Sequence, residues 1–287
     1  MYPSFLFWFR RNILIRLLIA TAGLHQSETT LLLSTQLARR AGIIPTVLTV
    51  VKNENNRGRA APILAHACQM VGPEISNLQT KVRVGQPAEE IIREAEEGHY
   101  DLIVMGEKRD YDLMTRLLGS TAKRVIEHAP CPVIIAKGKI GPIHRILLCD
   151  SGAESVSLLN RFIARLPALV EGDIEITVLH VMSQITAGPG VKGKQLRASA
   201  EELIQEHTPE GEILEQDVQI LQKSNLRPQP KVRHGLVVDE ILAEARGGDY
   251  DLVVIGAHRG TGWERLLLDD LAQQIIEQMD RPVLVVR

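Results

Sequence analysis

The chain has 287 residues, of which 45% are apolar and 24% charged, and its formal net charge is −2. This length is sufficient for two domains with hydrophobic cores of their own, and the ordinary composition argues against a disordered chain. The nearly neutral charge argues against an electrostatic nucleic-acid binder, and an aromatic content of 3% leaves few side chains on which bases could stack.

The three cysteines, Cys68, Cys131 and Cys149, are odd in number and form no C-x-x-C pair. A disulfide framework or a structural zinc site is therefore not expected, and a reducing compartment fits best. We accordingly predict a cytoplasmic protein. Cys131 lies between two prolines at the start of an apolar run, which favours a buried structural thiol over a reactive one.

Residues 1–14 are predicted to be an N-terminal extension. Its first ten residues contain three of the four phenylalanines and Trp8. Arg10, Arg11 and Arg16 interrupt this apolar run before it reaches the ~20 residues that span a bilayer. An ordinary extension, a segment that binds a membrane surface or a partner, and a signal peptide stay open, although signal cleavage would delete the first predicted strand.

Apolar runs and amphipathic segments then alternate along the chain. In the first part, strands are predicted at 16–20, 46–51, 79–84, 102–105 and 133–136, and helices at 26–40, 62–71, 87–97 and from Gly119 onward. After a short hinge the pattern starts again, with strands at 146–149, 174–181, 232–234 and 252–255 and helices at 154–166 and 237–246. This alternation predicts parallel strands joined by right-handed crossovers.

The two parts of the chain repeat one another. Gly85 and Gly106 recur 150 positions later as Gly235 and Gly256, and about half of the positions between them are identical to their partners. Internal duplication at domain length is a strong signal of repeated structure.

The duplication predicts two domains, at 15–138 (copy one) and 143–287 (copy two), joined by a hinge at 138–142. Before residue 85, the sequence distance from a residue of copy one to its match in copy two is smaller than 150. Copy two therefore carries extra residues that copy one lacks. We place this insert at about 186–230 and predict a surface excursion with one or two helices.

The stretch from Asp101 to Ala136 reads as strand, loop, helix and strand. Its first strand ends at Gly106, and its helix opens on Gly119, Ser120 and Thr121. Ligands of open parallel sheets bind at the carboxyl ends of the strands, where the amides of a glycine turn and a helix N-terminus favour an anion such as phosphate. Because serine and threonine are also common N-cap residues, simple capping of the helix stays open as the alternative.

Several phrases occur in both copies in the same order and spacing. They are VLTVV (47–51) and VLHVM (178–182), YDLIVMG (100–106) and YDLVVIG (250–256), and RLLGSTAKRVIEHAPCPVIIA (116–136) with its counterpart. In this arrangement the chain resembles the universal stress protein family, with two tandem copies that cover nearly everything after about residue 14.

The resemblance implies an α/β fold made of two tandem doubly wound domains, each with a five-stranded parallel sheet, of the adenine nucleotide alpha hydrolase-like type. It also implies that the last strands, Val133–Ala136 and Val283–Val286, pair with one another, so that one chain forms an intrachain pseudo-dimer. Such pairing hides exposed strand edges. Association of two chains into a homodimer stays open.

Some members of this family bind ATP through the pattern G-x-x-G, nine residues, then G-S or G-T. An Asp after the first strand and a Val in the second strand contact the nucleoside. Carried over residue by residue, the resemblance assigns a site in copy one to Val50, Gly106, Lys108, Arg109, Gly119, Ser120 and Thr121. The implied cofactor is ATP or another adenine nucleotide, with Mg²⁺.

Both copies depart from this pattern. In copy one Arg109 stands at the second glycine, where a Cβ hinders close approach of the backbone to phosphate, although Lys108 and Arg109 offer cationic donors. Ala22 stands at the aspartate and cannot replace its contact. In copy two Asp269 and Asp270 replace the Gly-Ser pair; carboxylates at a helix N-terminus favour the helix but repel a triphosphate. No ATP is expected there without a bridging metal ion.

The sequence contains no G-x-S-x-G elbow, no H-E-x-x-H and no P-loop, so no enzyme is expected.

The first hypothesis is a universal stress response protein with a regulatory or protective role, with nucleotide in copy one and a degenerate site in copy two. The alternative is a scaffold without nucleotide that docks a protein partner, for example a membrane transporter. A slow ATPase ranks last, because no residue is placed as a base or an arginine finger. Neither a nucleic-acid partner nor insertion into a membrane is expected.

Overall fold

The structure, a computed structural model, alternates strands and helices in the order that the sequence predicts. Copy one contains β1 (Ile15–Thr21), α1 (Glu28–Ala38), β2 (Ile43–Val51), the 3-10 helix η2 (Glu54–Arg59), α2 (Ala60–Val71), β3 (Gln79–Val84), α3 (Pro87–Glu97), β4 (Leu102–Gly106), α4 (Ser120–His128) and β5 (Val133–Ala136). Copy two contains β6 (Arg145–Cys149), α5 (Leu158–Arg165), the 3-10 helix η3 (Pro167–Leu169), β7 (Glu175–Met182), α6 (Ala200–Gln205), α7 (Pro209–Lys223), β8 (Arg227–His234), α8 (Val237–Gly247), β9 (Leu252–Gly256), α9 (Trp263–Gln278) and β10 (Val283–Val286). The structure describes residues 14–21, 23, 27–72, 75, 77–107, 118–149, 158–182, 198–223, 226–256 and 263–286, without the side chains of Asn160 and 263–270.

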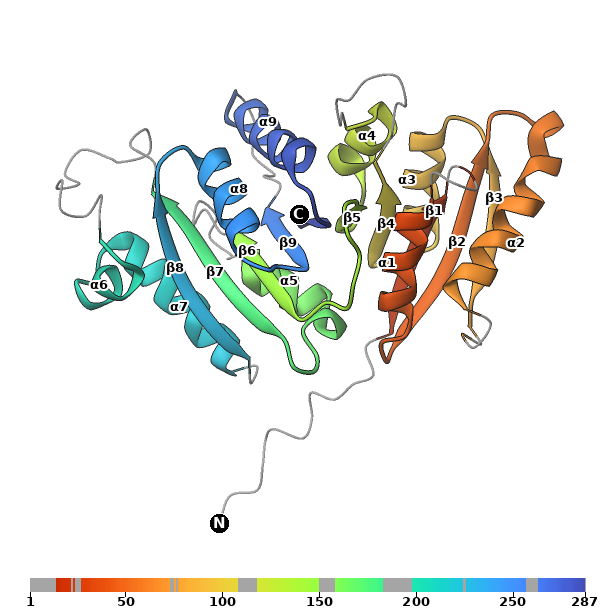
Figure 1. Cartoon of the computed structure of the whole chain (residues 1–287). Helices are drawn as coiled ribbons and strands as arrows, with labels where there is room; N and C mark the ends of the chain where they lie inside the picture. The colour runs from red at the N-terminus through yellow and green to blue at the C-terminus, as the bar shows by residue number, and fades with distance from the viewer. Residues whose placement is uncertain are drawn as a thin grey trace, which may run out of the picture.

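The ten strands form a single sheet in the order β3-β2-β1-β4-β5-β10-β9-β6-β7-β8 (Figure 1). Neighbouring strands run parallel, except that β5 and β10 are antiparallel. Each copy therefore contributes five parallel strands in the same spatial order. The predicted α/β fold with two tandem parallel sheets is confirmed.

The last strands of the two copies pair at the centre of the molecule. Ile135 lies opposite Val283, and Val133 lies opposite Val285. No residue of β5 or β10 is more than 2% exposed. The predicted pseudo-dimer within one chain is thus confirmed, and the pairing places two strand edges in the interior.

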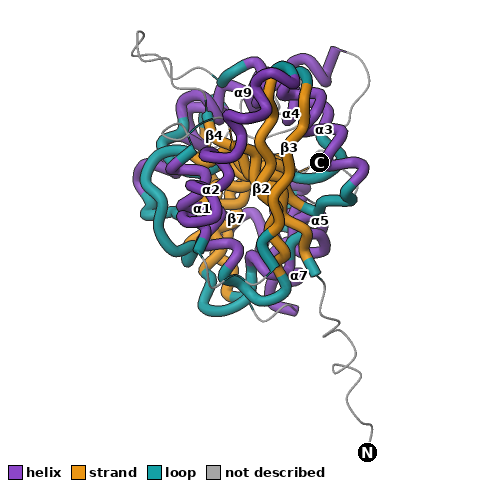
Figure 2. Tube along the Cα trace, turned by 90° about the vertical axis from the view of Figure 1, so that its right-hand side faces the viewer, coloured by secondary structure: helices purple, strands orange, loops and turns teal. Residues whose placement is uncertain are grey.

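Two layers of helices cover the sheet. The helices α1, α2, α5 and α7 pack on one face and α3, α4, α8 and α9 on the other, and Figure 2, which looks onto the β3 edge, shows helices on both sides of it. Because side chains alternate between the faces, strands covered on both sides are apolar throughout. In β4, Leu102 and Val104 belong to one core, whereas Ile103 and Met105 belong to the other. Both cores extend through both copies. Within the described ranges, no helix combines the length and apolar composition needed to cross a membrane.

The strand β8 is longer than the sequence predicts. It begins at Arg227, whereas the predicted strand begins at residue 232. The prediction started too late because Pro228 and Pro230 argue locally against a strand. Two features explain why these prolines fit. First, β8 lies at the edge of the sheet, so only one of its sides pairs with another strand. Second, the amide of Gly235 donates to the carbonyl of Met182 in β7, so the odd-numbered residues of β8 donate to β7. The nitrogens of the two even-numbered prolines therefore face away from β7.

The predicted insert of copy two is only partly a surface excursion. The helix α7 connects the second and third strands of copy two, as α2 does in copy one, and its Leu214 and Leu221 are buried in the core. The short α6 packs closely on α7 at Gly211. A Cβ at this glycine would lie 2.0 Å from the carbonyl oxygen of Leu203. The prediction is therefore wrong for α7, which is a core crossover helix, and residues 186–197 and 224–225 of the insert lie outside the described residues.

The predicted hinge is packed against copy two at its first residue. Gly138 has a φ of +67°, and a Cβ there would lie 1.7 Å from the carbonyl oxygen of Asp280. Both the left-handed backbone and this close approach require glycine. The sheet and its cores are continuous across the hinge, so the domain boundary at 138–142 stays a prediction.

A second contact between the copies comes from the end of α1. The guanidinium of Arg40 donates to the carbonyl oxygens of Ala168 (2.9 Å), Glu171 (3.1 Å) and Ile143 (3.1 Å), all in copy two. Burial lowers the pKa of Arg40 from its usual value, although the nearby Glu171 acts in the opposite direction. Three carbonyl acceptors satisfy a guanidinium that burial removes from water, so Arg40 helps to fix the copies relative to one another.

Candidate functional site

The candidate site lies at the carboxyl ends of β2 and β4 in copy one. Val50 is near the end of β2, and its partly buried side chain packs on the core that α3 and α4 cover. Gly106 is the last residue of β4. Because β1 lies between β2 and β4, Val50 and Gly106 flank the end of β1. The structure therefore brings both predicted residues to the same edge of the sheet.

The other described site residues form the start of α4, as predicted. Gly119 is the N-cap residue, with φ −61° and ψ 149°, and its carbonyl accepts the first helical bond from the amide of Lys123 (3.0 Å). Capping by the serine or threonine side chain does not occur at this position, because the N-cap is a glycine without a side chain. Ser120 is exposed. The first amides of α4 and the Ser120 hydroxyl are thus the hydrogen-bond donors that copy one presents at this helix N-terminus.

The end of β1 is fixed by a contact that the sequence did not indicate. The Oγ1 atoms of Thr21 and Thr49 lie 2.8 Å apart in a hydrogen bond, and Thr21 Oγ1 also donates to the carbonyl of Leu48 (3.2 Å). Both side chains are buried. The hydroxyls bond to one another beside the position that the family pattern gives to an aspartate, here Ala22. Ala22 lies outside the described residues, as do Lys108 and Arg109 of the predicted site.

An acidic side chain directly follows Gly106 and is also new to the site. The carboxylate of Glu107 lies 3.1 Å from the Nζ of Lys137, and their side chains are 9% and 1% exposed. Lys137 follows β5 and donates in addition to the carbonyl oxygens of Ile276 (2.6 Å) and Glu277 (3.3 Å) at the end of α9. A lysine directly after a buried strand was the available sequence signal, but the carbonyl oxygens that it reaches are 139 and 140 residues away.

The corresponding helix of copy two begins earlier than predicted. α9 starts at Trp263, so Asp269 and Asp270 lie inside the helix and not at its N-terminus. The prediction is wrong because it transferred the helix start from copy one. There Gly119 precedes the helix, whereas copy two has no glycine from Trp263 to Gln278 to stop it.

The geometry agrees with a comparison against protein families. The model of the universal stress protein family matches residues 53–137 and again residues 142–287. The chain belongs to the universal stress protein family. Two matches in one chain agree with the tandem arrangement of the sheet.

Known universal stress proteins resemble parts of this chain or its whole fold. Universal stress protein MJ0531 of Methanocaldococcus jannaschii is 47% identical over 60 residues, which are 21% of this chain and 35% of that protein. A universal stress protein of Methanothermobacter thermautotrophicus is 37% identical over 70 residues, 24% of this chain and 47% of that protein. The chain thus spans less than half the length of these curated relatives.

Solved universal stress proteins share the fold. One from Archaeoglobus fulgidus DSM 4304 superposes over 95% of this chain and 96% of its own, with a TM-score of 0.65 and 18% identity. Another from Archaeoglobus fulgidus, solved in complex with dAMP, covers 44% of this chain and 99% of its own, with a TM-score of 0.35 and 21% identity. The full-length superposition shows that the tandem fold of this chain occurs in other members of the family.

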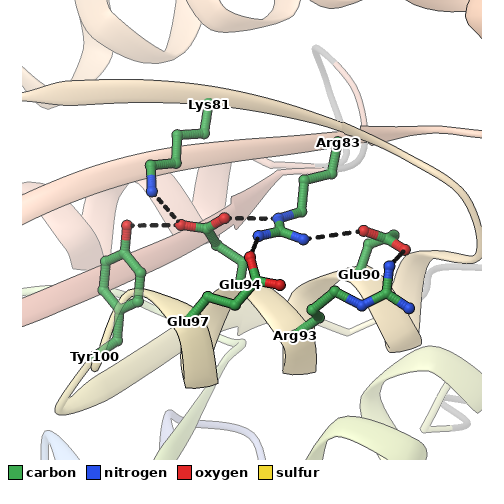
Figure 3. A network of polar contacts seen from close by, with 7 residues as sticks. All are labelled: Lys81, Arg83, Glu90, Arg93, Glu94, Glu97 and Tyr100. Carbon is green, nitrogen blue, oxygen red and sulfur yellow. Dashed lines mark hydrogen bonds and ion pairs between the residues drawn. The ribbon is translucent and has the colours of Figure 1, made fainter.

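Away from the candidate site, this universal stress protein repeats an ion network in both copies. In copy one, Glu94 of α3 accepts hydrogen bonds from Lys81 and Arg83 of the edge strand β3 and from the hydroxyl of Tyr100 (Figure 3). Glu244 of α8 accepts from the matching residues Lys231, Arg233 and Tyr250. The network ties each edge strand to its helix, so its role is structural.

The network predicts a loss of stability in acid. Burial alone would raise the pKa of Glu94, but the hydrogen bonds from Lys81 and Arg83 outweigh it and lower that pKa from its usual value. A carboxyl group whose pKa is lower in the folded protein stabilises the fold at every pH above its pKa in the unfolded chain, which is about 4.3 for glutamate. This stability is lost as the pH falls through the pKa of the folded protein. We expect Glu94→Gln to cost about 3 kcal/mol at pH 7 and to flatten the acid limb of stability against pH.

Urea unfolding between pH 7 and pH 3 measures this effect. The exposed pair of Glu54 and Arg57 supplies the control, because Glu54→Gln removes a surface ion pair worth about 0.5 kcal/mol or less. Equal losses in the two variants, or parallel pH profiles for Glu94→Gln and the unchanged protein, would contradict the prediction.

The buried thiol is confirmed. Cys131 is 5% exposed, and burial, with a smaller contribution from Asp101, raises its pKa to about 12. Such a thiol stays protonated near neutral pH and is a poor nucleophile. Cys131 therefore belongs to the core and not to the site.

Proposed function

We propose that this chain is a regulatory or protective stress protein that binds an adenine nucleotide in copy one and none in copy two. The observation that carries the proposal is the start of α4. It is an accessible helix N-terminus with a glycine N-cap, at the same edge of the sheet as Val50 and Gly106. In copy two the matching position lies inside α9, where backbone amides bond within the helix.

Phosphate binding follows from the chemistry of these groups. The amides of Ser120 and Thr121 and the partial positive charge of the helix N-terminus favour phosphate oxygens. Gly106 permits close approach of the backbone, since it has no Cβ. Lys108 and Arg109 are proposed to add charge-assisted contacts to the outer phosphates.

Recognition of the nucleoside is proposed to be weaker than recognition of the phosphates. Val50 offers an apolar contact, but Ala22 lacks the carboxylate of the family pattern. The hydroxyls of Thr21 and Thr49 are buried and bond to one another. ATP and similar phosphorylated nucleotides should therefore bind more tightly than adenosine.

The role proposed is binding and not turnover. Among the described residues, no group of three or more His, Cys, Asp and Glu side chains could hold a metal ion. Mg²⁺ is proposed to arrive with the nucleotide, held by its phosphates. We propose that the protein acts in the cytoplasm and changes its contacts with a protein partner when nucleotide binds.

Released nucleotide tests the proposal directly. The purified protein is denatured, and the supernatant is assayed by chromatography with mass detection, followed by calorimetry of the emptied protein with ATP and Mg²⁺. A single adenine nucleotide per chain, with tighter binding of ATP than of adenosine, supports the proposal. No released nucleotide and no heat of binding would overturn it and move the function to the partner-docking scaffold.

A further inference from the structure

Lys137 links the first residue after β4 to copy two. Lys137 is the first residue after β5, and its side chain is 1% exposed. Its ammonium contacts Glu107 of copy one and, on the other side, the carbonyl oxygens of Ile276 and Glu277 in copy two. The last turn of a helix carries partial negative charge, so Lys137 joins two negative groups that belong to different copies.

Glu107 has a position that makes its charge important for an anion site. It directly follows Gly106, at the start of the segment that leads to α4. Its side chain is 9% exposed, and a carboxylate at that depth requires a neutralising partner. A negative charge at the entrance of this segment would repel phosphate, whereas the ammonium of Lys137 cancels it.

The surroundings of Lys137 hold it in place. The strand before it, β5, pairs with β10 across the centre of the sheet, and Gly138 after it lies against the carbonyl of Asp280. The backbone on both sides of Lys137 is therefore fixed to copy two. The acidic residue itself is specific to copy one, because Ala257 stands in the sequence of copy two where copy one has Glu107.

We propose that Lys137 is a positioning residue that couples the site of copy one to α9 of copy two. It neutralises Glu107, and it holds the first residue of the loop against the end of α9. The effect on nucleotide affinity rests on the proposed function, whereas the mechanical coupling of loop and helix does not.

The charge balance gives opposite effects for the two partners. Lys137→Met removes one positive charge beside the proposed site, so nucleotide affinity should fall. Glu107→Gln removes one negative charge there, so affinity should rise. Each change should be on the order of tenfold at low salt, and the double variant should return close to the unchanged protein. A purely structural contact would instead weaken binding in both single variants.

Two measurements on the full chain test the charge effect and the mechanical coupling separately. Calorimetry with ATP and Mg²⁺ gives the affinities of the unchanged protein, both single variants and the double variant. Amide hydrogen exchange follows Met279, whose amide bonds to Ile275 in the last turn of α9. Glu107→Gln, a change in copy one, should speed the exchange of this copy-two amide several-fold.

A matched control uses Lys231→Met, which removes a lysine bonded to the buried Glu244 but remote from the loop and α9. It should change neither affinity nor exchange at Met279. Unchanged exchange at Met279 in Glu107→Gln, or affinity shifts of the same sign in both single variants, overturns the proposal. Faster exchange in a protein that binds no nucleotide would support the coupling while rejecting the proposed function.

Discussion

We expect Gly138→Ala to lower the free energy of unfolding by about 3 kcal/mol or more. Two effects combine at this residue. Its φ of +67° is in the left-handed region, which costs an alanine about 1–2 kcal/mol. The added Cβ would also lie 1.7 Å from the carbonyl oxygen of Asp280 and 2.5 Å from its carbon, and both atoms belong to backbone that cannot rotate away. The junction of β5 and β10 must therefore shift.

Two other glycines separate these effects. Gly172 has a φ of +96° with nothing within 4 Å of the point where a Cβ would lie, and Gly141 has the same open space without a positive φ. Urea unfolding should show almost no loss for Gly141→Ala, a loss of about 1–2 kcal/mol for Gly172→Ala, and the largest loss for Gly138→Ala. If Gly138→Ala and Gly172→Ala are equally stable, the close contact between the copies is not important for folding.

The sequence could predict the elements whose ends carry a local signal. The helix 87–97 is predicted correctly because Pro87 favours the first turn and Gly98 follows the last residue. The strand 79–84 alternates and is also predicted correctly. Strands buried on both faces are continuous apolar runs, so β4, β5 and β9 are visible as short apolar segments with glycine or proline nearby.

Features that depend on distant residues could not be predicted in this way. Nothing near Arg40 or Lys137 indicates that each reaches carbonyl groups of copy two. The two prolines of β8 argue locally against a strand, and only its place at the sheet edge makes them acceptable. The predicted helix start in copy two is wrong because a repeat does not preserve local structure where a glycine is lost.

The difference at Gly119 connects fold and function. Both copies have the same sheet order, contribute to both cores and contain matching networks at Glu94 and Glu244. The copies differ at the carboxyl end of the sheet, where copy one has Gly119 before α4 and copy two has Asp269 inside α9. The helix start at Gly119 therefore has no counterpart of the same geometry at Asp269.

Gly119→Asp should strongly weaken nucleotide binding without destabilising the protein. The backbone of Gly119, with φ −61° and ψ 149°, is compatible with any residue at an N-cap. An aspartate there accepts the first amides of α4 and adds a negative charge, so it occupies the donors that phosphate would use and repels it. We expect affinity for ATP with Mg²⁺ to fall on the order of a hundredfold, while the free energy of unfolding changes by only about a few tenths of a kcal/mol.

A loss of ATP binding without a loss of stability would show that the Gly119→Asp variant is folded but lacks the phosphate site. Gly119→Ala supplies the uncharged control: alanine caps poorly, so it should cost about 0.5–1 kcal/mol of stability but weaken ATP binding less than aspartate does. Asp269→Ala in copy two should leave ATP affinity unchanged, because that position lies inside α9. Calorimetry and urea unfolding on the same four proteins decide the matter. Retained ATP affinity in Gly119→Asp would mean that the start of α4 does not bind the phosphates.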